Sequence, residues 1–159
     1  MTAVRRWRQR AAAVGGALAM AGAASLATAG PASATAVGTT PIGSFSYSFQ
    51  GATIKVPTGC FLTHRIGGSG KKIKDEMAGV DCAGPAAIFS KFCNWRMDFT
   101  YANTSNKVYK TSKGKTHTEC KGNPLRHGKA QTLPKYGKAC AKFYVNGVHK
   151  ATQCHFIKK

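Results

Sequence analysis

Apolar and polar residues alternate along much of this chain from residue 44 onward. The clearest stretch is residues 92–101, where five apolar side chains share one face: Cys93, Trp95, Met97, Phe99 and Tyr101. Residues 44–49 alternate serine with Phe or Tyr in the same way. A period of two predicts a β-strand with one buried face, because a helix would scatter these apolar groups around its axis.

The rest of the pattern consists of short strand-like runs separated by turn residues. We expect further strands at residues 53–56, 60–66, 71–82, 107–111, 115–120, 139–145 and 148–157. No repeat and no long amphipathic helix interrupts them. Many short strands with frequent turns predict an all-β fold, a single-domain antiparallel β-sandwich or barrel over residues 45–159.

The register of the last hairpin depends on its turn, an Asn-Gly pair at residues 146–147 that is a strong hairpin signal. A strict two-residue turn in a regular hairpin would place Cys140 and Cys154 on opposite faces. A three-residue loop with a bulge at Gly147 pairs Val145 with His149 and sets the two cysteines opposite each other. We therefore predict the bulge and the disulfide Cys140–Cys154.

Two further disulfides account for the remaining cysteines. By proximity in the sequence we predict Cys60–Cys82 and Cys93–Cys120, although six cysteines allow many other connectivities. Trp95 lies beside Cys93 on the apolar face, so we expect it to pack in the core rather than to stack on a ligand. Three disulfides would reinforce a domain large enough to have its own core.

The N-terminus carries the pattern of a secretion signal over residues 1–34. Arg5, Arg6, Arg8 and Arg10 precede an apolar run at residues 11–29, and a small-residue Ala-Ser-Ala site ends at residue 34. The mature chain is therefore predicted to be secreted and extracellular, where disulfides form. No later apolar run is long enough to suggest a membrane span.

The chain is strongly basic. It has 24 Lys and Arg against five Asp and Glu. Without the four arginines of the signal, the net charge of the mature chain is 20 − 5 = +15. Such a charge keeps a protein soluble and attracts polyanions or acidic partners, so an anionic polymer is a possible partner. The alternative is a merely solvated surface, since the lysines are dispersed along the chain.

Enzyme chemistry has only a weak signal in this sequence. An exported nuclease would need a general base, a general acid and a cation for the phosphate. The residues that could supply them are His117, Glu119, His127, His149, Arg96 and Arg126. Such groupings are common in a basic protein, so we expect no enzyme activity.

Metal and cofactor sites are also not expected. The chain has no Cys-x-x-Cys motif, and its cysteines are better explained as disulfides. Asp75-Glu76 is the only adjacent acidic pair, and we expect it at a solvated strand edge. Arg96 and Asp98 are two residues apart on one face of a strand and are expected to pair with each other or across strands, in a structural role.

Residues 35–44 are small, polar and rich in turn formers, which predicts a flexible N-terminal arm. Nothing in the arm needs burial, so it could dock on a partner by strand addition. The partner-binding residues predicted on this basis are Thr35, Val37, Thr39, Thr40, Pro41 and Ile42. The aromatics that follow the arm are expected to cover the protein's own core.

Three stretches carry a family resemblance: residues 92–99, residues 136–140, and residues 144–147 continuing to 153–155. They resemble small secreted proteins of filamentous actinobacteria, and the chain looks most like the adaptor subunit of umbrella toxin particles. The resemblance implies a non-enzymatic linker between a repeat-bearing toxin polypeptide and a lectin-like subunit. It also implies that the extended N-terminal arm inserts into a cleft of the lectin.

The sequence thus favours a secreted adaptor or scaffold protein of an extracellular antibacterial toxin complex. Two alternatives stay open. One is a free cationic antimicrobial or cell-wall-binding protein, and the other is a secreted nuclease-like toxin.

Overall fold

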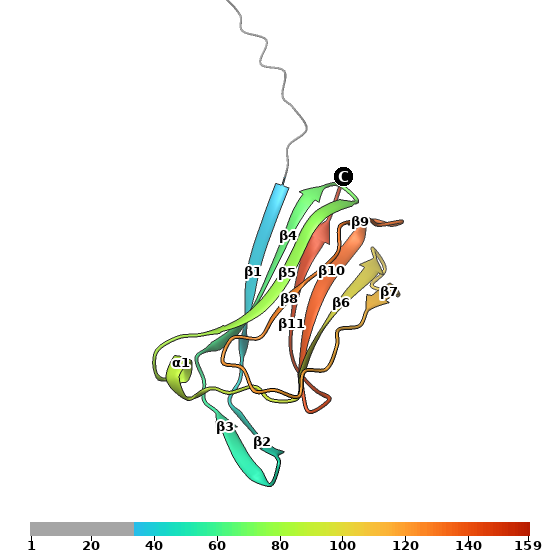
Figure 1. The fold of residues 1–159 in the computed structure, drawn as a ribbon. Coiled ribbons are helices and arrows are strands. Elements are labelled where there is room, and N and C mark those ends of the chain that lie inside the picture. The colour runs from blue at the N-terminus through green and yellow to red at the C-terminus, as the bar shows by residue number, and fades with distance from the viewer. Residues whose placement is uncertain (1–33) are drawn as a thin grey trace, which may run out of the picture. The chain divides into compact units, whose positions relative to one another are not determined.

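Two antiparallel sheets form the body of the protein in the computed structural model, which describes residues 34–159 (Figure 1). The first sheet has the order β1-β4-β5-β8, and β9 also pairs with β5. Its strands are β1 Ala34–Ile42, β4 Cys60–Ser69, β5 Lys72–Cys82, β8 Leu125–His127 and β9 Gln131–Thr132.

The second sheet has the order β11-β10-β6-β7. Its strands are β6 Trp95–Asn103, β7 Val108–Ser112, β10 Gly137–Val145 and β11 Val148–Ile157. A separate hairpin is made by β2 Phe45–Phe49 and β3 Ala52–Val56, and the short helix α1 spans Pro85–Phe89. The predicted all-β antiparallel sandwich is confirmed.

The core lies between the two sheets and follows the period-two pattern. On β6, the side chains of Trp95, Met97, Phe99 and Tyr101 are all buried, as the alternation predicted. The facing residues of β10 are small or apolar, and Leu62 and Ile66 of β4 are buried on the first sheet. Burying Trp95 and its neighbours removes a large apolar area from water, which is the main stabilisation available to the fold.

All three predicted disulfides are present: Cys60–Cys82, Cys93–Cys120 and Cys140–Cys154. Cys60 lies directly opposite Cys82 in the β4–β5 register, and Cys140 lies opposite Cys154 in the β10–β11 register. Each of these two bridges therefore joins neighbouring strands of one sheet, with Cα atoms 4.0 Å apart.

The predicted bulge at Gly147 is wrong, although the disulfide that it was meant to explain is correct. Val145 pairs with Val148, so the turn contains only the Asn-Gly pair, and both of its residues have positive φ. Asn-Gly adopts this turn at little cost. The register shifts further along, where Lys150 is the extra residue between His149 and Ala151, and this shift brings the cysteines together.

The flexible arm expected at residues 35–44 is also corrected. Ala34–Ile42 is strand β1, paired along its whole length with β4. Its even-numbered side chains from residue 36 to 42 turn inward, and Ile42 is only 2% exposed. Pro41 is tolerated because β1 is the edge strand of this sheet. The predicted secretion signal lies outside the described residues, apart from Ala34.

Two local differences complete the comparison with the sequence. The strand expected at residues 115–120 is reduced to isolated bridges, in which His117 pairs with Trp95 and Lys121 pairs with Phe92. Pro85 begins α1, where a missing backbone N–H costs nothing. In the part of the chain that the structure describes, no helix has the length and apolarity needed to cross a membrane.

Candidate functional site

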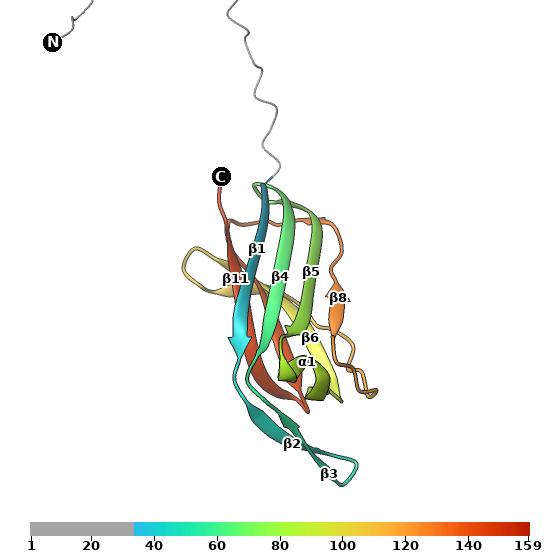
Figure 2. The same cartoon turned by 90° about the vertical axis from the view of Figure 1, so that its left-hand side faces the viewer.

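The outer face of the first sheet, on the side away from the second sheet, is exposed and is turned toward the viewer in Figure 2. We call the part of this face away from the β4–β5 turn the threonine face. The definition leaves out the exposed Lys72 and Lys74 of β5, which lie toward that turn, and keeps the other outward residues of four strands. They are Thr35, Val37, Thr39 and Pro41 of β1, Phe61, Thr63 and Arg65 of β4, Asp75, Met77 and Asp81 of β5, and Leu125 and His127 of β8.

Pairing between strands aligns these residues in rows. Thr39, Thr63 and Gly79 form one row that continues to Leu125, and Val37 and Arg65 begin the next. With normal strand spacings, the face is about 14 Å wide and about 20 Å long.

The threonine face has a low net charge, and its central row, which consists of Thr39, Thr63, Gly79 and Leu125, carries no charge. Its only cation is Arg65, which forms an ion pair with Asp75 at 3.1 Å. With Asp81 as the second acid, the net charge of the face is 1 − 2 = −1. Large apolar side chains are exposed there instead: Val37 is 61% exposed and Leu125 is 50% exposed. The described chain as a whole has 20 basic residues against five acidic ones, so the low charge of this face is a local property.

The structure divides the predicted arm residues between two sides of β1. Thr35, Val37, Thr39 and Pro41 lie on the threonine face and are exposed. Thr40 and Ile42 point inward, and Thr40 donates hydrogen bonds to the Thr152 carbonyl and the Gln153 side chain of β11. Four of the six predicted residues therefore remain available to a partner.

Close packing against β11 holds β1 in place. A side-chain carbon at Gly38 would lie 2.3 Å from Nε2 of Gln153, so only glycine fits there without a shift. His155, on the same strand as Gln153, places its Nε2 atom 2.8 Å from the His64 carbonyl of β4. The threonine face is thus built on a strand fastened to both sheets.

A buried polar cluster lies beneath the face, and it corrects the expectation that Glu76 is solvated. Glu76 is only 2% exposed, and its Oε1 atom lies 3.1 Å from Nε2 of the fully buried His64. Its Oε2 atom accepts a hydrogen bond from the Tyr101 hydroxyl, which in turn accepts one from Gln131. The cluster joins β4 and β5 to β6 across the core.

The alternation itself contained the signal for this cluster. Glu76 has the same parity as the buried Ala78 and Val80, and His64 lies between the buried Leu62 and Ile66. A carboxylate in such a position has to find partners inside the protein, because an unpaired buried charge is very costly.

Burial shapes the acid–base properties around the cluster. It raises the pKa of Tyr101, and the hydrogen bond to Glu76 and the charge of Glu76 add to the rise. Burial also lowers the pKa of Arg126. Arg126 donates to the carbonyls of Met97 and Ser112 at 2.6 and 2.7 Å, so its guanidinium is held within the fold.

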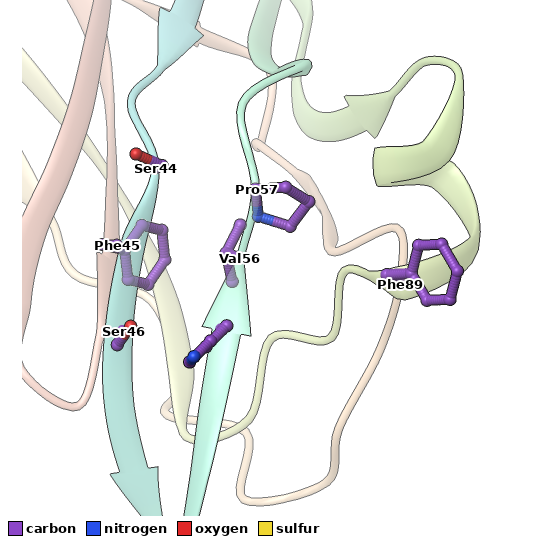
Figure 3. Close-up of a pocket in the computed structure, with 7 residues that line it drawn as sticks. Ser44, Phe45, Ser46, Val56, Pro57 and Phe89 are labelled. Atoms are coloured by element: carbon purple, nitrogen blue, oxygen red, sulfur yellow. The ribbon is translucent and has the colours of Figure 1, made fainter.

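A groove extends from the hairpin end of the threonine face. It has a volume of about 620 Å³ and is lined by Ser44, Phe45, Ser46, Lys55, Val56, Pro57 and Phe89. Figure 3 shows Phe45 and Val56 on the hairpin side and Phe89 on the α1 side. Tyr47 anchors the hairpin by donating to the Lys91 carbonyl and accepting from the Cys93 amide, both at 2.8 Å.

The residues considered for nuclease chemistry have mostly structural contacts. His117 stacks on the buried Trp95 with ring centroids 4.1 Å apart, and its Nδ1 atom lies 3.8 Å from Glu119. His127 lies on the threonine face, where it is the cross-strand partner of Met77. His149 contacts Tyr144 in the last hairpin.

Two other sequence expectations can be compared directly with the structure. Arg96 pairs with Asp98 at 3.0 Å, as predicted, and Trp95 lies in the core at 1% exposure. Within residues 34–159, no three His, Cys, Asp or Glu side chains are grouped as metal ligands would be. No family model, curated protein or solved structure matches this chain.

Proposed function

We propose that the protein is a secreted, non-enzymatic adaptor that binds a protein subunit of an extracellular complex through its threonine face. The observation that supports this most directly is the low charge of that face in a strongly basic chain. Protein interfaces are depleted of charged residues at their centre, because each charge must lose its water on binding.

The composition of the face supports the same proposal. Val37, Phe61 and Leu125 supply exposed apolar area, and short threonine side chains lose little conformational freedom on contact. The adjoining groove offers a place for an apolar side chain of the partner between Phe45 and Phe89. β1 contributes through its exposed side as a paired strand, not as a free arm.

The resemblance to umbrella toxin adaptors gives the proposal its specific form. The partners would be a repeat-bearing toxin polypeptide and a lectin-like subunit of an antibacterial complex. Three disulfides suit a protein that works outside the cell. The same resemblance implies an inserted arm, so insertion would require residues 35–42 to leave their pairing with β4.

The test is an affinity capture from culture supernatant with the tagged protein. Thr39 and Thr63, which are paired on the face, are both changed to lysine. The control changes the exposed Thr111 and Thr118 to lysine, which adds the same charge elsewhere. We expect the face variant to capture about tenfold less partner than the control, because buried lysines must be desolvated.

Three results would contradict the proposal. Equal capture by both variants would remove the threonine face from the interface. Recovery of this chain alone, with growth inhibition by the pure protein, would support the antimicrobial alternative. RNA cleavage that is lost on His117→Ala would support the nuclease alternative.

A further inference from the structure

The lysines of the folded protein are concentrated at one end of the sandwich. We call this region the lysine end, formed by the β4–β5 turn, the segment around β9, the β6–β7 turn and the C-terminus (Figure 1). It contains Lys71, Lys72, Lys74, Lys107, Lys110, Lys129, Lys135, Lys138, Lys158 and Lys159. These are half of the 20 cations in the described chain.

Strand pairing and hydrogen bonds join the parts of this end. Lys72 pairs with Thr132 of β9, and the Lys71 carbonyl accepts a hydrogen bond from the Leu133 amide at 2.8 Å. Tyr109 of β7 donates to the Lys135 carbonyl at 3.2 Å. Lysines that are more than 60 positions apart in sequence, such as 71 and 135, therefore share one surface.

No described Asp or Glu side chain at this end is left to neutralise the lysines, and the one other carboxylate is the terminal group of Lys159. Of the two acids on the nearby part of β5, Asp75 is paired with Arg65, and Glu76 is buried. A cluster of like charges is unfavourable in isolation, and it produces a positive field that concentrates anions.

A groove runs across the lysine end between β5 and β9. It has a volume of about 430 Å³ and is lined by Lys72, Ile73, Lys74, Ala130, Gln131 and Thr132. Lys110 reaches the same place, with its Nζ atom 2.5 Å from Oε1 of Gln131. Lys72 and Lys74 thus line the groove, Lys110 reaches it, and Lys129 directly precedes the lining residue Ala130, so lysines from three segments of the chain border it.

We propose that the lysine end binds a linear phosphodiester polymer and recognises the charge of its backbone. Lysine binds phosphate as a compact point charge, and charges arranged along a groove suit a chain better than a small anion. Phe156 is 67% exposed, but Lys138 and Lys158 lie 5.2 and 5.8 Å from its centroid. These cations compete with stacked bases for the ring, so the proposed ligand is a backbone such as poly(glycerol phosphate).

This inference does not depend on the adaptor proposal, because it uses a different surface and a different class of ligand. It gives the protein a way to stay on an anionic extracellular surface while the threonine face binds a protein.

The test measures binding of labelled poly(glycerol phosphate) to the full mature protein by fluorescence anisotropy. One variant changes Lys72, Lys74 and Lys129 to glutamine. The matched control changes Lys91, Lys113 and Lys115, which are also exposed and remove the same charge. Circular dichroism checks that both variants fold, as expected for surface substitutions.

We expect the lysine-end variant to lose about 100-fold in affinity at about 0.1 M salt, and the slope of log K against log salt to fall by about 2 in magnitude. The control should lose less than about threefold. Equal losses in both variants would overturn the proposal, since net charge alone would then explain binding. Equally tight binding of polyglutamate, or binding of single-stranded DNA without binding of the glycerol polymer, would also overturn it.

Discussion

The threonine face and the lysine end share strand β5 but differ in the forces that would govern binding. The face carries one cation, paired with Asp75, whereas the end carries ten lysines and no unpaired, exposed Asp or Glu side chain among the described residues. The difference comes from position along the same strands. The net charge of +15 therefore describes neither surface of this protein, because regions with opposite binding properties meet on β5, at Lys74 and Asp75.

The largest expected effect concerns the buried cluster of Glu76, His64 and Tyr101, which joins β5 to β4 and β6. Glu76→Leu leaves the buried Tyr101 hydroxyl and His64 ring without their shared partner. We expect the free energy of unfolding to fall by about 3 kcal/mol or more, measured by guanidinium denaturation. Glu76→Gln is the control, because its amide can still accept from Tyr101 and should cost much less. Equal costs would mean that the hydrogen bonds contribute little.

The second prediction separates the two regions by salt. Raising the salt from about 50 to about 200 mM should weaken phosphodiester binding by about 100-fold or more if six lysines contact phosphates. Binding of the protein partner should change by less than about threefold, because the threonine face is nearly neutral. Parallel salt titrations of the two complexes measure both. A steep salt dependence of partner binding would erase the proposed distinction.

The third prediction affects the face and spares the end. Gly38→Ala places a carbon against Gln153, so β1 must shift or Gln153 must move. Because the nearest atom is the end of a flexible glutamine side chain, we expect a loss of only about 1 kcal/mol in stability. Partner binding should weaken, and phosphodiester binding should not change. Gly43→Ala is the control, because a side chain there meets nothing within 4 Å. If Gly38→Ala bound the partner normally, the exact position of β1 would not matter.

The smallest expected effect is a change in alkaline stability. Burial and Glu76 raise the pKa of Tyr101, so above about pH 10 the unfolded chain loses a proton that the folded protein keeps. The stability that the neutral phenol contributes is complete below that pH and is lost as the pH rises further. Tyr101→Phe should therefore flatten the decline of unfolding free energy between about pH 9 and about pH 11. An unchanged decline would show that the phenol does not take part.

Much of the fold could be predicted because strand alternation is a local property. The buried face of β6 and all three disulfides follow from residues close together in the sequence. The bulge was misplaced because Asn-Gly is compatible with several loops, and only the paired strands decide where the extra residue lies. Contacts between β10 and β11 decide that Lys150 is the bulged residue.

The candidate sites were harder to predict, for a related reason. The arm residues looked free because small polar side chains give no sign of burial, yet β4 had an edge available for them. Glu76 looked solvated because a carboxylate usually is, and only the approach of Tyr101 and His64 makes its burial possible.

By itself, the sequence determined the class of fold and a large positive charge, since alternation and composition do not depend on tertiary contacts, whereas it only suggested the cysteine pairs by their proximity. The tertiary structure alone decided that β1 is a strand, that Glu76 is buried and that the lysines gather at one end. These features require residues distant in sequence to meet, and their energies arise only when the two sheets pack together.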